Sequence, residues 1–300
     1  MGEWVEDRMP RSVVVGIGEV LWDVFPHGEH FGGAPANVAM HAAALGAKSY
    51  MVGAVGPDAR GDAALARLDA AGVNRTAVAQ LLGRPTGVVN VSVGAKGQPS
   101  FDIAADVAWD YLPWSEAVDD AAGRADAFCF GTLAQRAAVS RATIKRALKA
   151  TRKSAWRLFD VNLRQNYYDE RVVTSSLELA NAVKLNDEEL PVVARLCKLA
   201  PGDVVDQLRM VCDWFGLRLA ALTRGAAGSL LVTPGEVCES AAPATTVCDT
   251  VGAGDAFTAA LLVGLLKGRS LTEVSERANA VAAYVCSQPG ATPPIPASLR

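Results

Sequence analysis

The sequence predicts an α/β fold with three layers, α/β/α, in which helices cover both faces of a mainly parallel central sheet. Short runs rich in β-branched residues alternate with amphipathic or alanine-rich stretches along most of the 300 residues. This alternation is typical of βαβ units, which build parallel sheets. Three further strand-like runs have no helix between them, and they indicate a second, smaller group of strands.

The predicted elements run from an N-terminal strand to two C-terminal helices. The valine-rich segment Ser12–Gly18 predicts the first strand, and the alanine-rich segment Gly33–Leu45 predicts the first helix. A second helix, Ala59–Ala71, is followed by Gly72, a residue type that commonly ends helices. The other predicted strands are Ser49–Val55, Ala127–Phe130, Ala155–Asp160, Ala182–Leu185, Arg218–Thr223, Ser229–Val232, Val237–Ser240 and Ala244–Val247. The other predicted helices are Val139–Ala150, Val204–Phe215, Ala253–Lys267 and Leu271–Cys286.

The three strands outside this rhythm suggest a cover for a binding site. They are Val20–Phe25, Thr86–Val93 and Pro99–Ala104, and the last two are joined by Gly94-Ala-Lys-Gly97, which fits a hairpin turn. Strands without crossover helices do not belong in a parallel sheet.

The domain organisation follows from these assignments. We expect a β lid formed by about residues 20–31 and 86–108, within a single domain over residues 11–300. There is no internal repeat, and no linker rich in Pro, Gly or Ser divides the chain. Residues 1–10 are polar, and we expect them to be a disordered tail.

The charge balance is nearly even, with 29 Lys and Arg against 32 Asp and Glu, giving a net charge of -3. This balance argues against a basic nucleic-acid-binding face. If the protein binds phosphates, it must do so through local devices such as backbone amides, a metal ion or a few placed cations.

Three further features predict a cytoplasmic protein without a membrane partner. The longest apolar stretch, Ala256–Leu266, is too short to span a bilayer. Met1–Pro10 lacks the basic start and apolar run of a signal peptide. The six cysteines form no Cys-x-x-Cys pair, so we expect buried, reduced thiols.

The segment Asp249-Thr-Val-Gly-Ala-Gly-Asp-Ala-Phe257 precedes an apolar helical run. Its glycines, Gly252 and Gly254, let the backbone bend so that successive N–H groups converge at the positive end of a helix, which makes an anion hole. Asp255 lies in the first helical turn. It could take a proton from a hydroxyl that attacks a bound phosphate, or it could simply cap the helix. The residues alone leave both readings open.

The segment Asp249–Asp255 resembles the C-terminal signature of the ribokinase-like (PfkB) carbohydrate kinases. Gly32-Gly-Ala-Pro-Ala-Asn-Val-Ala39 is similar to the N-terminal signature of that family. Further blocks match in the expected order, and the resemblance covers nearly the whole chain. They are Leu45-Gly46, Val55-Gly-Pro-Asp58, Asp160-Val-Asn-Leu-Arg164, Lys184-Leu-Asn-Asp-Glu-Glu189 and Leu222-Thr-Arg-Gly225.

The resemblance implies a ribokinase-like fold and an enzyme that transfers the γ-phosphoryl group of ATP to a sugar hydroxyl. It implies that Asp255 is the general base. It also implies that the amides around Gly252, Ala253 and Gly254 stabilise the charge that develops on the transferred phosphoryl group.

For the nucleotide, the resemblance implies a set of residues late in the chain. Asn186 and Glu189 would help to place Mg²⁺ through water, although an Asn followed by acidic residues is also typical of an ordinary helix N-terminus. Thr223 and Gly225 would contact the phosphates and ribose of ATP. Asn279 would lie near the adenine, and by itself it looks like an exposed helical residue.

The resemblance also implies a monovalent cation such as K⁺ behind the anion hole. Asp249 and the carbonyl of Val251 would be ligands, with others from Ser287–Ala291. Gln288-Pro289 departs from the usual residues of that last loop. Members of the family often pair through their lids, so a homodimer is a further expectation.

At the substrate end, Asp23 closes a strand at the base of the predicted lid, where a carboxylate can accept hydrogen bonds from two sugar hydroxyls. Gly32 and Gly33 allow close approach of the backbone, and Asn37 can donate and accept. Three aromatic side chains in or near the lid could lie against a sugar face, or could be lid core or dimer contacts. They are Trp22, Phe101 and Trp109.

The substrate itself is a narrower question. The Gly32–Asn37 block resembles fructokinases more than ribokinases, in which Lys usually occupies the place of Ala34. Arg164 occurs in fructokinases and also in 2-keto-3-deoxygluconate kinases, where it would serve an acidic sugar. Fructose is therefore the first expectation, with 2-keto-3-deoxygluconate or ribose as alternatives. A non-catalytic sugar sensor is the alternative from another class.

Overall fold

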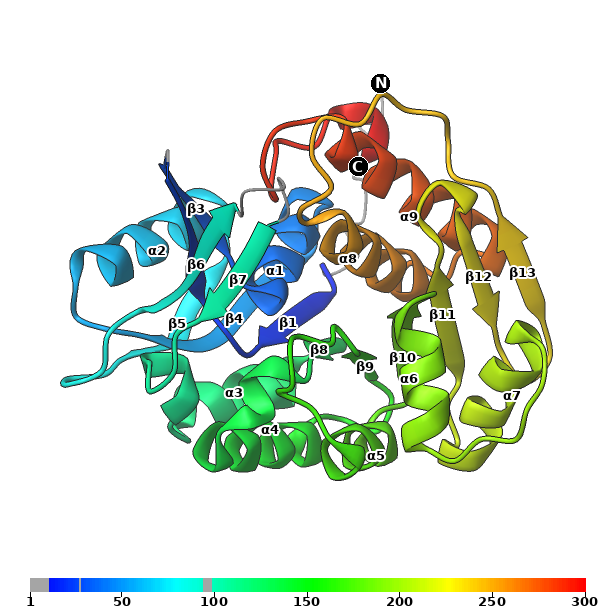
Figure 1. The fold of residues 1–300 in the computed structure, drawn as a ribbon, viewed down its shortest axis with the longest axis horizontal. Coiled ribbons are helices and arrows are strands. Elements are labelled where there is room, and N and C mark those ends of the chain that lie inside the picture. The colour runs from blue at the N-terminus through cyan, green and yellow to red at the C-terminus, as the bar shows by residue number, and fades with distance from the viewer. Residues whose placement is uncertain (1–10, 27, 94–98) are drawn as a thin grey trace, which may run out of the picture.

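The computed structural model describes residues 11–26, 28–93 and 99–300, which form one large and one small sheet (Figure 1). The large sheet has nine strands in the order β13-β12-β11-β10-β9-β8-β1-β4-β5, and the small sheet has four in the order β3-β2-β6-β7. The expectations for residues 1–10 and for the turn at 94–97 lie outside the described residues.

The large sheet is mainly parallel, as the alternating pattern predicts. Every neighbouring pair from β5 to β11 runs parallel, and only β12 and β13 at one edge are antiparallel. The carboxyl ends of these parallel strands therefore lie along one edge of the sheet. The strand order reverses between β1 and β8. Parallel α/β sheets bind ligands at such a reversal point. The strands are β1 Val13–Ile17, β4 Lys48–Val55, β5 Asn74–Gln80, β8 Ala127–Phe130, β9 Trp156–Asp160, β10 Ala182–Asn186, β11 Leu219–Thr223, β12 Ser229–Val232 and β13 Val237–Ser240.

Helices cover both faces of this sheet, which gives the three layers of the ribokinase-like fold (Figure 1). Neighbouring residues of β9 point to opposite faces of the sheet. Leu158 belongs to the hydrophobic cluster formed with α1, α8 and α9, and Phe159 belongs to the cluster formed with α3 to α7. A third cluster places α2 against β4 on the side of α1. The helices are α1 Ala34–Ala44, α2 Ala59–Ala70, α3 Glu116–Arg124, α4 Ala138–Ala150, α5 Glu170–Leu179, α6 Glu189–Leu196, α7 Val204–Phe215, α8 Ala253–Leu266 and α9 Leu271–Cys286.

The small sheet is built from the two segments that the sequence analysis assigns to a lid. Its strands are β2 Leu21–Phe25, β3 Gly28–Gly32, β6 Gly87–Val93 and β7 Pro99–Ile103. It has one strand more than expected, because β3 pairs antiparallel with β2 along all five of its residues. β3 begins and ends with glycine and has three exposed residues, so its sequence carries little strand signal.

The two tryptophans of this region have different environments. Trp109 is fully buried, and a β-carbon at Gly87 would lie 2.2 Å from its Nε1, so the ring belongs to the core beneath the small sheet. Trp22 packs edge-on against Phe31 at 5.7 Å. Because successive strand residues point to opposite faces, Trp22 lies on the other face of the small sheet from Asp23.

Several element assignments differ from the prediction. Ala244–Val247 is not a strand: all four residues are exposed and no neighbouring strand pairs with them, so β-branched composition alone was not enough. Strand β5 and helices α3, α5 and α6 were not predicted. Two of these helices have a weakened signal, since α6 contains Pro191 and α3 contains Gly123, both poor helix formers.

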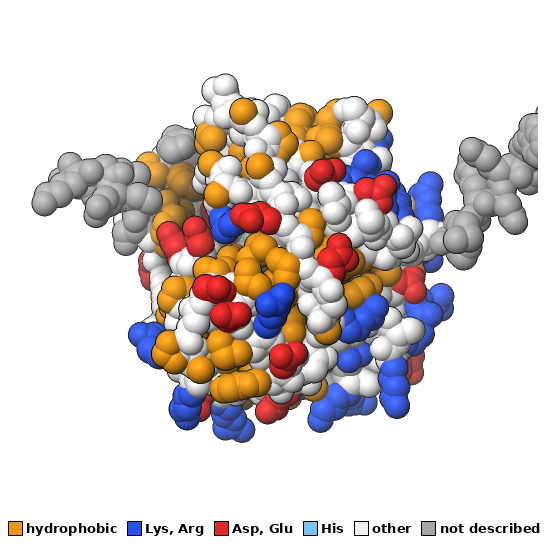
Figure 2. Space-filling view, turned by 90° about the vertical axis from the view of Figure 1, so that its right-hand side faces the viewer, with side chains coloured by type: hydrophobic (Ala, Val, Ile, Leu, Met, Phe, Trp, Pro, Cys, Tyr) orange, Lys and Arg blue, Asp and Glu red, His pale blue; other side chains and the backbone are white. Residues whose placement is uncertain are grey.

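At the end of the molecule formed by β12, β13 and α9, acidic, basic and apolar side chains are interspersed (Figure 2). Within the described residues, no helix has the length and apolar character needed to cross a membrane. All six cysteines are free; four are buried, whereas Cys248 is exposed and Cys286 is half-buried, so the expectation of buried thiols was wrong for Cys248.

Candidate active site

The N-terminus of α8 forms the sharp bend that the glycine spacing predicts. Gly252 precedes the helix with φ 78°, and a β-carbon there would lie 2.3 Å from the carbonyl oxygen of Ala291. Both the left-handed backbone and the contact require glycine. The first-turn amides of Ala253 and Gly254 lie at the positive end of the helix, where an anion is favoured.

Asp255 lies in this first turn and reaches across to α1. Its Oδ2 accepts a hydrogen bond of 2.8 Å from Nδ2 of Asn37. Burial, followed by the nearby charge of Asp160, raises the pKa of Asp255 to about 6, against the opposing effects of Asn37, Lys184 and Arg164. The group is ionised at neutral pH and has a pKa close enough to 7 to accept a proton readily.

The predicted substrate residues at the start of the chain converge beside the small sheet. A β-carbon at Gly32 would lie 2.8 Å from Oδ2 of Asp23, and one at Gly33 would lie 2.4 Å from the carbonyl oxygen of Glu19. Gly33 also has φ 108°, so no other residue fits there. Burial raises the pKa of Asp23, opposed by the charges of Arg164 and His30.

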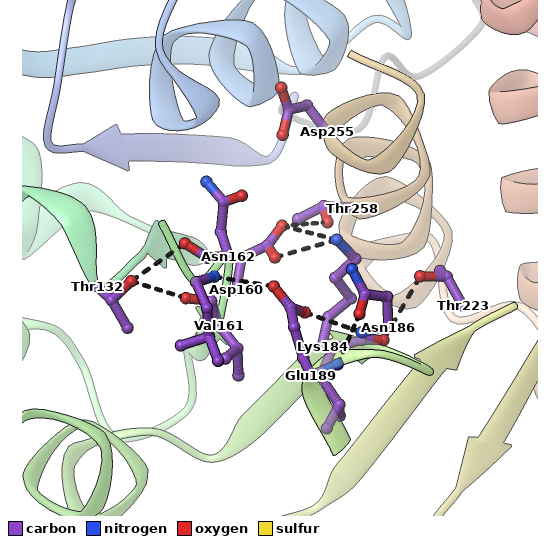
Figure 3. A network of polar contacts seen from close by, with 12 residues as sticks. Thr132, Asp160, Val161, Asn162, Lys184, Asn186, Glu189, Thr223, Asp255 and Thr258 are labelled. Atoms are coloured by element: carbon purple, nitrogen blue, oxygen red, sulfur yellow. Dashed lines mark hydrogen bonds and ion pairs between the residues drawn. The ribbon is translucent and has the colours of Figure 1, made fainter. Parts of the chain in front are cut away.

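Arg164 is exposed, in the loop that follows β9. Its positive charge lowers the pKa values of Glu19, Asp23 and Asp255, so it lies within electrostatic range of all three carboxylates. Asn162 in the same loop has φ 41°, a conformation that Asn tolerates. Oγ1 of Thr132 holds the loop by donating to the carbonyls of Val161 at 3.0 Å and Asn162 at 3.1 Å (Figure 3).

Asn186 and Glu189 form a reciprocal cap at the end of β10. Oδ1 of Asn186 accepts from the amide of Glu189 at 2.8 Å, and Oε2 of Glu189 accepts from the amide of Asn186 at 2.9 Å. Oε1 of Glu189 accepts from the amide of Leu163 at 2.9 Å, which ties this turn to the loop after β9. Each carboxylate oxygen keeps a lone pair that could accept a hydrogen bond from metal-bound water. Within the described residues no group of His, Cys, Asp and Glu side chains forms a ready metal cage.

The other predicted nucleotide residues are spread along the same end of the sheet. Thr223 pairs with Asn186 across β10 and β11, so their backbones are adjacent. Gly225 follows with φ 55°. Asn279 is buried, and its Nδ2 donates to the carbonyl of Ser240 at 3.1 Å. The reading of Asn279 as an exposed residue was wrong, because α9 packs this face against β13.

The residues predicted for a monovalent cation lie close to one another. Oδ1 of Asp249 accepts from the amide of Val251 at 3.0 Å, and Oδ2 accepts from the amide of Gly290 at 3.2 Å. The motif and the loop at 287–291 are therefore joined directly.

Two buried ionisable side chains near the predicted site residues, Glu19 and His41, were not predicted from the sequence. Glu19 is almost inaccessible, its Oε2 has no hydrogen-bond partner, and burial raises its pKa to about 7. His41 on α1 donates from Nε2 to the carbonyl of Ala291 at 2.9 Å, and burial lowers its pKa to about 4, which keeps it neutral. The sequence offered little signal for either, since Glu19 is a single carboxylate after a strand and His41 lies within an alanine-rich helix.

A buried polar cluster, also not assigned from the sequence, lies between β9, β10 and α8. Nζ of Lys184 lies 3.1 Å from Oδ1 of Asp160, and Oγ1 of Thr258 donates to Oδ2 of Asp160 at 2.8 Å (Figure 3). The cluster connects β9 and β10 to the helix that carries Asp255.

Comparison with known proteins agrees with this geometry. The model of the pfkB family carbohydrate kinases matches residues 18–298. The chain belongs to this family. As a pfkB carbohydrate kinase, it transfers a phosphoryl group to a hydroxyl group of a sugar.

Individual relatives of this kinase are similar over most of their length. A putative sugar kinase of Pyrococcus horikoshii is 31% identical and covers 93% of this chain and 92% of its own. A fructokinase of Klebsiella pneumoniae is 31% identical and covers 83% of each chain. The crystal structure of a Pyrococcus horikoshii sugar kinase in complex with ATP superposes with a TM-score of 0.78, at 30% identity over 93% of each chain.

Proposed function

We propose that this kinase transfers the γ-phosphoryl group of ATP to a primary hydroxyl of free fructose. The observation that carries the proposal is the position of Asp255 beside the Gly252–Gly254 bend, hydrogen-bonded to Asn37 at 2.8 Å. In the proposed reaction Asp255 accepts the hydroxyl proton while the sugar oxygen attacks the γ-phosphorus. The bond to the oxygen that bridges the β- and γ-phosphates breaks, and ADP leaves.

The first-turn amides around Gly252, Ala253 and Gly254 would then stabilise the charge on the transferred group. The proposed nucleotide contacts are Asn186, Glu189, Thr223, Gly225 and Asn279. Mg²⁺, which would neutralise phosphate charge, prefers to keep several waters, and Glu189 is suited to bind such waters through its remaining lone pairs. K⁺ is proposed at Asp249 and the carbonyl of Val251, beside the loop amide of Gly290.

The sugar would be chosen by Asp23, Gly32, Gly33 and Asn37, with the small sheet as its lid. Asp23 accepts hydroxyl hydrogen bonds, and the two glycines leave room that a side chain would fill. The 31% identity to a fructokinase supports fructose. One observation favours a second candidate, a sugar acid such as 2-keto-3-deoxygluconate, because the exposed Arg164 has no carboxylate within ion-pair distance among the described residues.

The test is ADP release measured over fructose, ribose, 2-keto-3-deoxygluconate and nucleosides, in wild type and in Arg164→Gln. Fructose should give the highest kcat/KM. If the natural substrate is a sugar acid, its kcat/KM should exceed that of fructose and should fall much further in Arg164→Gln. ADP release that no sugar increases would support the sensor alternative and refute the proposal.

A further inference from the structure

Lys184 is not among the residues of the proposed reaction. It is, however, the one lysine among the described residues that is buried. It lies on β10, with 8% of its side chain exposed, and its partner Asp160 at the end of β9 is 4% exposed. Burying a charged pair is costly in free energy. A buried charge near the ligand-binding edge of the sheet therefore indicates a functional role for Lys184.

The ammonium group of Lys184 lies directly against the turn that forms the anion hole. A β-carbon at Gly254 would lie 3.1 Å from Nζ of Lys184, so the lysine occupies the space next to the second motif glycine. Figure 3 shows Lys184 reaching from its strand toward α8, the helix that carries Asp255 in its first turn. The buried cation and the helix N-terminus thus act on the same small volume.

The lysine is held in place by a fixed acceptor. Nζ lies 3.1 Å and 3.4 Å from the two carboxylate oxygens of Asp160, and Thr258 donates to Oδ2 of Asp160 at 2.8 Å. An ammonium group has three N–H donors, and Asp160 can engage two of them at most. At least one donor is left for a ligand on the side of α8.

The charge of Lys184 persists despite its burial. Burial lowers its pKa, but the carboxylates of Asp160, Glu189 and Asp255 more than offset this, and its pKa is raised overall. The group therefore remains protonated at neutral pH.

We propose that Lys184 is a catalytic residue whose remaining N–H donor contacts a non-bridging oxygen of the phosphoryl group during transfer. Asp160 and Thr258 are positioning residues that fix the ammonium group. The inference rests on the proposed function of Asp255 and the anion hole. Lys184 transfers no proton: the hydroxyl proton goes to Asp255, and the negative charge released by the broken O–P bond remains on ADP. A fixed cation in a water-poor site stabilises developing charge far better than one in water.

The competing explanation is that Lys184 only neutralises Asp160. Lys184→Met alone would leave a buried carboxylate unpaired, and the protein could fail to fold. The decisive variant is therefore Lys184→Met/Asp160→Asn, which removes both charges and keeps an oxygen that can accept from Thr258. Asp160→Asn alone shows the effect of losing the carboxylate. Lys198→Met is the control for losing a lysine, because Lys198 pairs with Glu170 at 2.8 Å on the surface.

We expect the double variant to melt cooperatively and to bind ADP nearly as wild type does, while kcat falls by about 10²- to 10³-fold, as when one transition-state donor is removed. Aluminium fluoride imitates the phosphoryl group in the transition state, so binding of ADP with aluminium fluoride should weaken far more than binding of ADP alone. Asp160→Asn alone keeps the lysine but weakens its hold, so kcat should fall by less than in the double variant. A double variant with kcat close to that of wild type would overturn the proposal. Wild-type protein without sugar-dependent ADP release would instead refute the proposed function.

Discussion

The side-chain amide of Asn37 donates a 2.8 Å hydrogen bond to Asp255. This bond joins α1, which follows β3, to α8, which follows the glycine bend. The two residues are 218 positions apart in the chain. The bond brings the proposed sugar site and the proposed phosphoryl-transfer site to one point.

Replacing Asp255 should separate catalysis from binding. Asp255→Asn keeps the shape of the side chain but removes the proposed base, so kcat should fall by about 10²- to 10⁴-fold while sugar affinity changes little. Steady-state ADP release and sugar titration by calorimetry measure the two effects. Turnover near the wild-type level would exclude Asp255 as the base.

The same substitution should stabilise the protein in a defined pH range. Because the folded-state pKa is raised to about 6, protonated Asp255 is favoured by folding, and this stability is lost as pH rises through 6. Asp255→Asn should therefore unfold at higher denaturant concentration than wild type at pH 8, and the difference should vanish below about pH 4, where both states of wild type are protonated. A larger gain at pH 4 than at pH 8 would contradict the raised pKa.

The acidic limb of the pH–rate profile should move with the partners of Asp255. In wild type kcat/KM should fall below about pH 6, as the base becomes protonated. Asn37→Leu removes a hydrogen bond that lowers the pKa of Asp255, so the limb should shift to higher pH. An unchanged limb in this variant would show that another group controls the profile.

Glu19→Gln should leave this acidic limb in place. Glu19 and Asp255 repel each other when both are ionised, and this repulsion raises the pKa of Glu19. Because the pKa of Glu19 is raised to about 7 and that of Asp255 to about 6, Glu19 is still mostly protonated, and therefore uncharged, where Asp255 loses its proton. The measurement is the same pH profile of kcat/KM, and a shift of the limb to lower pH would show that Glu19 is ionised while Asp255 titrates.

Gly252 and Gly268 have similar backbone angles, so replacing each by alanine distinguishes the effect of backbone strain from the effect of a steric contact. Gly252 has φ 78° and Gly268 has φ 66°, but only Gly252 has neighbours that an added β-carbon would meet within 4 Å. Gly268→Ala should cost about 1 kcal/mol of stability and leave kcat unchanged. Gly252→Ala should cost more and also lower kcat, because the added carbon displaces Ala291 or the bend itself. Equal loss of kcat in both variants would argue against the anion hole.

Local sequence signals placed several elements at the bounds that the structure shows. The strand at Ala127–Phe130, the helices at Val204–Phe215 and Leu271–Cys286 and the bend before α8 appear at the residues predicted. These segments have strong periodicity or glycine at positions that need a left-handed backbone. β3 was not predicted, and the strand predicted at 244–247 is absent, because a strand forms only where a neighbouring strand can pair with it.

Asp23, Asn37, Asp249 and Asp255 could be chosen from the sequence because each lies in a short motif with chemistry of its own, set within the family resemblance. Only the tertiary structure showed that Glu19, His41 and Lys184 are buried. His41 and Lys184 have partners that are distant in the chain, whereas burial leaves Oε2 of Glu19 without a partner and raises the pKa of that carboxyl group. The sequence by itself determined the layered α/β fold and the family, because periodicity and motifs are local. The buried cation beside the anion hole was decided by packing, because the position of Lys184 against Gly254 depends on how β10 meets α8.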